Sequence, residues 1–352
     1  MKQPWIHNAK TDWRFILSPP FLVLTIIVLF QGQIQNLENH YSFYTWLILI
    51  VFVDVAHVYS TLFKTYFIRE EFRRRKLLYL GIPAVSLILG LIFYQFGSLF
   101  FWSVLALVAV FHFVRQQYGF MRLYARFEKK GFSKFWDGIA IYSATVFPML
   151  YWIKTPRAFN WFVENEFSWF DSLPNFVPGI TLIYWIILGI WILKTIYFFI
   201  KDKTLNIPKN AIIVGTYLSW YFGIVYFNND LIFTLLNVIS HGIPYIALIY
   251  IREIKQKENS SLKNLSIFKT SFGILLFVLI IIGFAFFEEL IWEVLVWREH
   301  FSIQSFELSM SWQQFLVPLL VVPQLTHYLL DGFIWKIRKN KKPPNNQYRE
   351  FH

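Results

Sequence analysis

Four histidines are embedded in long apolar segments of this chain, and each has a polar side chain about one helical turn away. Spacings of three or four residues place each group on one face of a helix. Imidazole and carboxylate groups bind iron, copper and zinc, and they also transfer protons. The sequence therefore predicts either a metal site or a proton relay. The four groups are Asp54 with His57, His112 with Arg115 and Gln116, Asn237 with His241, and His327 with Asp331.

The segments that carry these residues are predicted to cross a membrane. The chain of 352 residues is 56% hydrophobic and only 15% charged, which is far from the composition of a soluble domain. An apolar helix of about 20 residues crosses the ~30 Å hydrocarbon core of a bilayer. We therefore expect an all-α, polytopic bundle with one transmembrane domain over 1–338 and a disordered basic tail over 339–352. About ten spans are predicted, over 13–31, 43–67, 77–94, 98–121, 135–153, 177–200, 210–228, 231–251, 269–287 and 312–335.

The basic residues predict how this bundle is oriented. An even number of spans puts both termini on one side, and the segments on that side hold 28 of the 33 Lys and Arg residues. Cytoplasmic loops of membrane proteins are enriched in Lys and Arg. We therefore predict multi-pass insertion in a bacterial-type inner (plasma) membrane with both termini in the cytoplasm. The net charge of +12 follows from this distribution, so membrane lipids and not nucleic acid are the expected partners.

The four embedded histidines are predicted to lie at one depth in the membrane. Their spans all run toward the cytoplasm, and each histidine lies about 8–12 residues, or ~12–18 Å, from the cytoplasmic end of its span. One histidine in a membrane helix is ordinarily explained by an interhelical hydrogen bond. Four at matched depth, each with a polar partner, favour a shared site in the bundle interior, where ionisable groups are usually functional.

Several other kinds of site are excluded or not matched. Cysteine is absent, so thiolate metal sites and iron–sulfur clusters are excluded, and no phosphate-binding Gly-rich loop, G-x-S-x-G motif or Rossmann fingerprint occurs. The clustered histidine boxes of membrane desaturases and the paired histidines of membrane b-type cytochromes are also missing. One histidine on each of four helices is similar in ligand number to membrane carotene-cleaving oxygenases. Their local motifs are absent, so this similarity concerns ligand count alone.

The favoured interpretation is an integral membrane metalloenzyme, a non-haem iron oxidoreductase or oxygenase that acts on a lipid or other hydrophobic molecule and draws on an electron donor. In it the four embedded histidines bind the metal. Asp54 and Asp331 would orient the imidazoles or bind the metal directly. Arg115 would pair with one of these carboxylates or, with Gln116, hold a substrate head group or an oxygen-derived ligand. The expected cavity-lining residues are Asn237, Tyr118, Tyr245 and Tyr328.

Two alternatives remain open on the sequence. Zinc, copper or a haem with two axial histidines could take the place of iron. A transporter or proton-coupled permease could use the same His, Asp and Arg residues as a relay or substrate site. An inverted repeat would favour transport, but the expected histidine-bearing spans all run in one direction. The acidic segment 286–301 is expected to lie along the outer membrane interface as an amphipathic helix.

Overall fold

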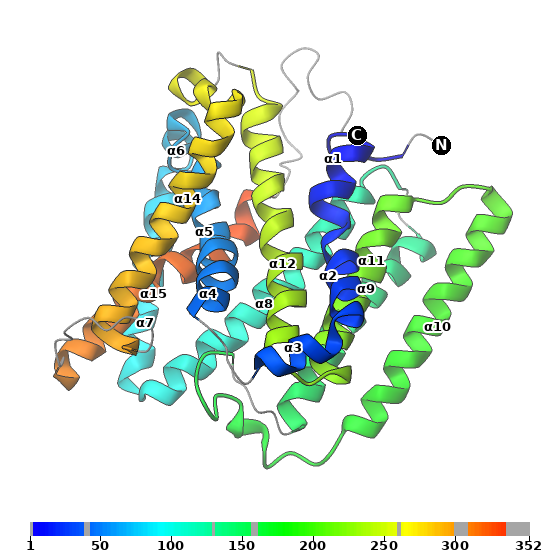
Figure 1. Ribbon diagram of the computed structural model, residues 1–352, viewed down its shortest axis with the longest axis horizontal. Helices are drawn as coiled ribbons and strands as arrows, with labels where there is room; N and C mark the ends of the chain where they lie inside the picture. Colours follow the sequence, from blue (N-terminus) through cyan, green and yellow to red (C-terminus); the bar gives the residue numbers. More distant parts are fainter. Residues whose placement is uncertain are drawn as a thin grey trace.

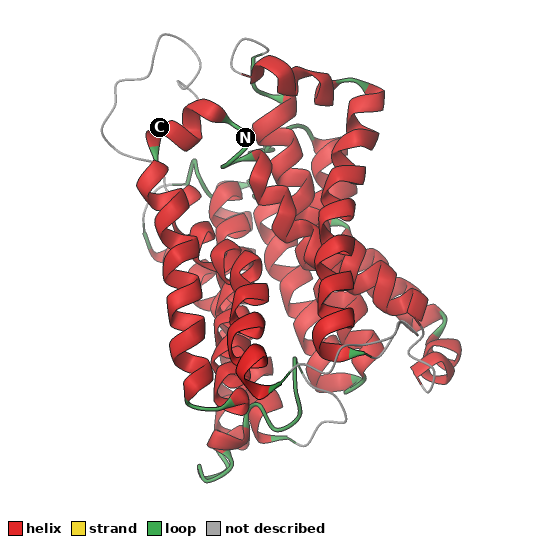
Figure 2. Ribbon diagram, turned by 90° about the vertical axis from the view of Figure 1, so that its left-hand side faces the viewer, coloured by secondary structure: helices red, strands yellow, loops and turns green. Residues whose placement is uncertain are grey.

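The computed structural model describes residues 3–38, 43–128, 131–155, 161–258, 262–298 and 309–335, and the expected tail over 339–352 lies outside these residues. Throughout the described part the regular elements are helices, arranged as a bundle (Figures 1 and 2). Labels η mark 3₁₀ and π segments. The elements are α1 Ala9–Asp12, η1 Trp13–Leu17, α2 Pro19–Leu29, α3 Gln31–Glu38, α4 Phe43–Thr45, η2 Trp46–Val55, α5 Ala56–Ser60, η3 Thr61–Phe63, α6 Arg69–Arg74, α7 Lys76–Gln95, α8 Ser98–Tyr124, α9 Phe132–Lys154, η4 Ser168–Phe170, α10 Val177–Asp202, α11 Ile207–Trp220, η5 Tyr221–Tyr226, α12 Asp230–Ile249, η6 Tyr250–Lys255, η7 Lys263–Lys269, α14 Ser271–Trp292, η8 Glu293–Trp297 and α15 Met310–Ile334.

Seven helical runs in the described residues are long and apolar enough to cross a membrane. The count rises to eight if the two N-terminal pieces, Ala9–Leu17 and Pro19–Leu29, form one span bent by 54°. The expected spans 135–153 and 210–228 are also helical, but they are not among these seven. Helix α14 continues through η8 without a break, so the interfacial amphipathic helix expected over 286–301 is wrong for its described part. The all-helical architecture, with several apolar helices long enough to span a membrane, is therefore confirmed, and the number ten stays a prediction.

Segments rich in Lys and Arg meet at one end of the bundle. Arg126, just after α8, donates hydrogen bonds to the backbone carbonyls of Pro4 and Trp5. Gln256, just after η6, donates to the carbonyl of Ile6. The N-terminal segment therefore lies beside the C-terminal ends of α8 and η6, at the upper end of Figure 1. We call this the basic end.

The four histidine-bearing helical runs are parallel. The Lys64 ammonium, directly after η3, lies 2.5 Å from a carboxylate oxygen of Glu253 in η6 and 4.1 Å from the ring centre of Trp335. Three of these runs therefore end together, and η6 also ends beside α8 at the basic end. The common direction expected from the sequence is present in the fold.

The helices differ in how much of their surface the protein itself covers. Only 17% of the apolar window of α7 and of α10 is buried, and 28% of that of α14, whereas 72% of the α12–η6 window is buried. Large apolar side chains on α7, α10 and α14 are exposed. Such a surface is suited to lipid, because a helix that is apolar all round must be covered by protein or by a bilayer. Because most of its surface is covered by protein, α12 is the central helix of the bundle.

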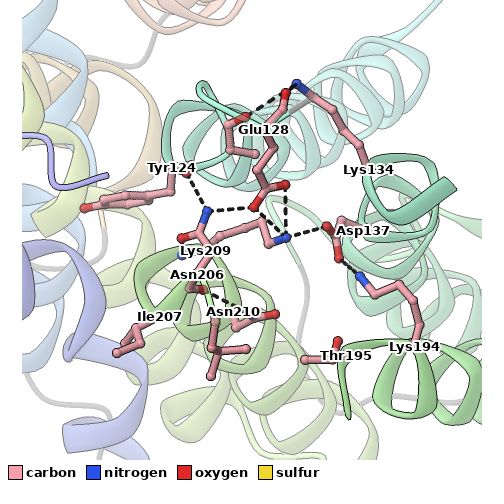
Figure 3. A network of polar contacts seen from close by, with 12 residues as sticks. Tyr124, Glu128, Lys134, Asp137, Lys194, Thr195, Asn206, Ile207, Lys209 and Asn210 are labelled. Carbon is pink, nitrogen blue, oxygen red and sulfur yellow. Dashed lines mark hydrogen bonds and ion pairs between the residues drawn. The ribbon is translucent and has the colours of Figure 1, made fainter. Parts of the chain in front are cut away.

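A buried ion-pair network fixes the largely uncovered helix α10 to its neighbours (Figure 3). Asp137 of α9 is fully buried and accepts hydrogen bonds from Lys194 and from Trp191 Nε1 of α10. Its second oxygen lies 2.7 Å from the ammonium of Lys209 in α11, which also contacts Glu128 at 2.9 Å. Buried charges require such partners, since an unpaired one is costly in a low-dielectric interior. The network joins α9, α10 and α11 near the basic end.

The central helix α12 approaches η2 very closely beside one of the embedded histidines. A Cβ atom placed on Gly242 would lie 2.8 Å from Val53 Cγ1 and 2.9 Å from the Val53 carbonyl oxygen. Real Cβ atoms do not sit at such distances, so a larger residue would push the two helices apart. Gly242 therefore allows His241 of α12 to reach His57, which follows η2.

Candidate metal centre

The four embedded histidines are buried and meet at one place in the bundle interior. They come from α5, α8, α12 and α15, which contact one another near the middle of the molecule (Figure 1). Their rings form a closed loop in the order His57, His241, His112, His327. Neighbouring ring centres in this loop are 4.6, 5.1, 4.7 and 4.9 Å apart. The fold thus brings together the four residues that the sequence singled out.

The shape of this loop suits a central ion. His57 and His112 lie opposite each other, with ring centres 6.2 Å apart and planes inclined by only 18°. Imidazoles on opposite sides of one metal, at a metal–nitrogen distance of ~2.1 Å, would have centres about 6–6.5 Å apart. His57, His112 and His241 each offer a ring nitrogen within 4.8 Å of the other two. At least three histidines could therefore share one ion.

The individual nitrogen atoms support the same conclusion. The Nε2 atoms of His57 and His241 are 3.1 Å apart. Two nitrogens bound at neighbouring positions of one metal at ~2.1 Å are separated by about 3.0–3.4 Å. The Nε2 atoms of His112 and His327 are buried and have no hydrogen-bond partner. Buried polar atoms without a partner are rare, and a cation would satisfy both.

Three of the four rings have a polar group beside their other nitrogen. Thr61 Oγ1 lies 2.8 Å from His327 Nδ1. Asp54 Oδ1 lies 3.5 Å from His57 Nδ1, and Asp331 Oδ2 lies 3.7 Å from His112 Nδ1. Only the contact of Thr61 with His327 is a hydrogen bond, and Asp54 Oδ1 and His57 Nδ1 have no hydrogen-bond partner among the described residues. A hydrogen bond at this nitrogen holds a histidine ring in one orientation and leaves Nε2 free to bind a metal.

The position of Asp331 differs from the simplest reading of its sequence spacing. It follows His327 by one turn, but its carboxylate lies 3.7 Å from the ring of His112, on another helix. Its other oxygen accepts a hydrogen bond of 2.5 Å from the Tyr245 hydroxyl. His112, His327 and Asp331 also offer ligand atoms that all lie within 4.8 Å of one another. Asp331 can therefore orient His112 or bind an ion itself.

Two amide side chains expected at the site are hydrogen-bonded to the backbone of α12. Gln116 of α8 donates a hydrogen bond of 2.8 Å to the backbone carbonyl of His241. Asn237 of α12 is buried and donates to the carbonyl of Phe233, 3.1 Å away. The oxygen atoms of both amides are buried without a hydrogen-bond partner. Gln116 thus ties α8 to α12 beside the histidine loop.

Arg115 and Tyr118 lie away from the histidine loop. The Arg115 side chain is exposed, donates to the Tyr142 hydroxyl and lies over the Tyr118 ring, 5.0 Å from its centre. Among the described residues no ion pair links Arg115 to Asp54 or Asp331. Tyr118 lines an open groove between α9 and α10. The structure therefore does not bring these two residues to the histidines, although they share α8 with His112.

The histidine loop has aromatic walls. Tyr328 stacks on His112 with ring centres 4.7 Å apart, and the Tyr245 ring lies 5.2 Å from His327. Phe113 stacks almost parallel on His241, with ring centres 3.7 Å apart. Tyr245 and Tyr328 were expected here from their position in the sequence. Phe113 was not, because aromatic residues are too frequent in this chain for one of them to stand out.

Thr61 is a site residue that the sequence reasoning missed. It follows His57 by four residues, so it lies on the same helix face and the spacing could have indicated it. A threonine in a membrane helix is common, however, and the partner of Thr61 is His327, which is 266 positions away. Only the packing of α15 against the end of α5 and η3 brings the two together.

Local backbone geometry adapts the helices to this site. The ten residues of η2, Trp46–Val55, form π-helical turns that contain Asp54 and end two residues before His57. Such turns change the direction in which side chains point and occur frequently at functional sites. Pro244 and Pro323 lie inside α12 and α15, within one turn of the histidines there. Proline removes a backbone hydrogen bond and leaves a carbonyl oxygen to find another partner.

Two carboxylates lie beside the histidines without a directly bonded cation among the described residues, although the Lys64 ammonium is within electrostatic reach of Asp331. Asp54 and Asp331 lie beside the loop, and no described lysine or arginine forms an ion pair with either. Carboxylates in a low-dielectric region require a compensating positive charge or a proton. Four imidazoles and two carboxylates form a set of N and O ligands that suits a divalent transition metal.

Comparison with known proteins gives no assignment. No family model matches the chain, and neither a curated protein nor a solved structure matches it significantly. The function must therefore be inferred from the site itself.

Proposed function

We propose that this chain is an integral membrane metalloenzyme with a single metal ion held by His57, His112, His241 and His327. The observation that carries the proposal is the closed loop of four buried imidazoles, in which the His57 and His241 Nε2 atoms are 3.1 Å apart. An interhelical hydrogen bond involves only two residues, so it does not explain why four rings from four helices surround one point.

Iron without haem is the proposed metal. Imidazole and carboxylate ligands suit iron, copper and zinc alike, and two carboxylates beside four neutral rings favour a divalent ion. A haem with two axial histidines would need the space between them for its macrocycle. Here His241 and His327 take up that space, since each lies within 5.1 Å of both His57 and His112.

The proposed reaction class is oxidation or oxygenation of a lipid or another hydrophobic molecule. The site lies within helices that are apolar enough to span a membrane, and its walls are aromatic. Bound iron would supply oxygen activation and electron transfer, with electrons drawn from an external donor. The chain's own residues would hold the rings in place through Thr61, Asp54 and Asp331, and exclude bulk water through Tyr328 and Phe113.

We also propose the orientation of the protein in the membrane. The ends of the histidine-bearing helices and the N-terminal segment meet at the basic end. Positive residues are retained in the cytoplasm. The basic end, with both termini, is therefore placed on the cytoplasmic side of a bacterial-type inner membrane, with about ten spans in all.

Metal analysis of the purified, detergent-solubilised protein tests the central proposal. We expect about one iron per chain after anaerobic purification, no Soret band, and a high-spin ferrous nitrosyl signal in the electron paramagnetic resonance spectrum after nitric oxide is added. Stoichiometric zinc would keep the metal site but overturn the redox assignment. A Soret band would replace it with haem.

Absence of any stoichiometric metal would favour a different function, a proton-coupled transporter in which the histidines and carboxylates form a relay. The observation that supports this alternative is the row of acidic side chains next to the histidine loop, including Asp54, whose side chain is 30% exposed at mid-span. Uptake assays in proteoliposomes with an imposed pH gradient would then be the appropriate measurement.

A further inference from the structure

A groove lies between the start of α7 and the end of α15. It has a volume of about 540 Å³ and is lined by the four consecutive basic residues 73–76 and by the apolar side chains of Leu77, Leu78 and Phe333. This volume is within the usual range of ligand sites, about 300–1,000 Å³. The short helix α6, which leads into α7, lies at the upper end of Figure 1, so the groove is at the basic end. We call it the basic groove.

The basic groove carries positive charge that the protein neutralises only in part. The segment 69–76 contains five basic and two acidic residues. Glu71 forms an ion pair with Arg74 and lies 3.2 Å from Arg75 Nε. Arg73 and Lys76 are exposed and form no ion pair with any described residue. Two cations at the groove are therefore available to an anionic ligand.

The rest of the groove is apolar and uncovered. Leu77 is 90% exposed, and Phe333 near the end of α15 is 43% exposed. Arg75 donates a hydrogen bond of 3.4 Å to the Phe333 carbonyl, which joins the start of α7 to the end of α15. Leu77 also begins the apolar surface of α7, of which the protein covers little. Positive charge and apolar surface thus meet in one groove.

We propose that the basic groove binds one anionic phospholipid, with its phosphate at Arg73 and Lys76 and its acyl chains against Leu77 and Phe333. Arg and Lys bind phosphate oxygens through charge-assisted hydrogen bonds. Basic pockets between membrane helices on the cytoplasmic side are suited to anionic head groups. The bound lipid would supply the counter-charge and cover the exposed leucine. The inference does not depend on the metal centre.

Other occupants fit the groove less well. The chain's own segment after Trp335 carries six Lys and Arg residues and one acidic side chain, so like charges would repel it from the groove. A free phosphate ion would pair with Arg73 and Lys76 but leave Leu77 and Phe333 uncovered. An anionic phospholipid matches both the charged and the apolar part.

Native mass spectrometry of the detergent-solubilised protein tests this proposal, because it resolves individual bound lipids. Titration with dioleoylphosphatidylglycerol gives the affinity of the first lipid, and dioleoylphosphatidylcholine is the zwitterionic comparison. The groove variant Arg73→Gln/Lys76→Gln removes the two cations that have no ion pair. The matched control Arg14→Gln/Lys201→Gln removes one Arg and one Lys at exposed positions of η1 and α10, so both variants have the same net charge.

We expect wild type and the control to bind phosphatidylglycerol at least about 10-fold more tightly than the groove variant does, since each Lys or Arg near an anionic head group adds several-fold to the affinity. Wild type should also prefer phosphatidylglycerol over phosphatidylcholine by at least about 10-fold, and this preference should decrease at high salt. Equal losses in the two variants would show attraction by the total charge alone. That result, or equal affinity of wild type for the two lipids, would overturn the proposal.

Competition with inorganic phosphate identifies the source of the bound anion. Displacement of the lipid by an equimolar amount of phosphate would make a free ion the occupant and overturn the lipid assignment. Retention of the lipid supports it, because the acyl chains contribute to binding.

Thermal unfolding in detergent provides a second measurement, because a ligand that binds the folded state stabilises it. Phosphatidylglycerol should raise the unfolding temperature of wild type and of the control more than that of the groove variant. An equal rise in all three proteins would contradict a site in the groove. If the double variant does not fold, Arg73→Gln and Lys76→Gln are titrated separately. Weaker binding in either one supports the site, and wild-type affinity in both refutes it.

Discussion

His57 and His241, from helices almost two hundred positions apart in the chain, place their Nε2 atoms 3.1 Å from each other. A direct hydrogen bond between two neutral imidazoles would also fit this distance. That bond would leave the Nε2 atoms of His112 and His327 buried and unsatisfied, however. A shared metal ion would account for the Nε2 atoms of all four rings.

Replacing these histidines should remove the metal. We expect His57→Ala and His241→Ala to bind less than about a tenth of the wild-type iron after identical purification, because each loses a ligand and leaves a cavity. His7→Ala is the matched control, since His7 lies at the basic end and contacts Asn8. The measurement is the number of iron atoms per chain in each purified variant, by elemental analysis. Wild-type occupancy in both site variants would rule out the metal role.

Asp331 should act through the orientation of His112. The change Asp331→Asn keeps the size of the side chain but removes its charge, and lost partners of this kind typically cost ~10–100-fold in metal affinity. Tyr245→Phe, which removes the hydroxyl that binds Asp331, should have a smaller effect in the same direction. Competition with a chelator measures the affinity. A wild-type affinity in Asp331→Asn would show that its charge is dispensable.

Gly242→Ala should disrupt the approach of α12 to η2. The added methyl group would overlap the Val53 backbone and side chain, and overpacking of this kind typically costs about 1–3 kcal/mol. We expect a lower thermal unfolding temperature in detergent and reduced metal occupancy. Gly283→Ala in α14 is the control, because a Cβ there meets no atom within 4 Å. Equal effects of the two substitutions would contradict a site-specific role for Gly242.

Asp137→Asn should loosen the attachment of α10. The substitution leaves Lys194 and Lys209 buried next to a neutral amide, and removing one partner of a buried ion pair typically costs about 3–5 kcal/mol. We expect faster proteolysis in the loop between α9 and α10 and a lower unfolding temperature. Lys201→Met, at an exposed position of α10, is the control and should resemble wild type. Metal content should change little, since the network lies away from the histidines.

Labelling of single cysteines tests the orientation, and the absence of native cysteine keeps this experiment clean. A membrane-impermeant thiol reagent applied to intact cells should label Glu164→Cys and leave Arg74→Cys unlabelled, because the two positions lie at opposite ends of the bundle. After the cells are broken, both should react. The reverse labelling pattern would place the basic end outside and refute the predicted topology.

The sequence alone was enough to predict the helical membrane architecture and to identify the four histidines as site residues, because both predictions depend on local properties of the chain. An apolar run of about 20 residues can satisfy its backbone in a bilayer only as a helix, and an ionisable side chain within it is costly wherever it lies. What the sequence could not provide was the rotation of each helix about its axis. That rotation places Asp331 beside His112, Thr61 beside His327, and Glu288 in the interior, while Arg115 faces outward. These partners are set by packing, such as the contact of Gly242 with Val53, and packing joins positions that no spacing along the chain relates.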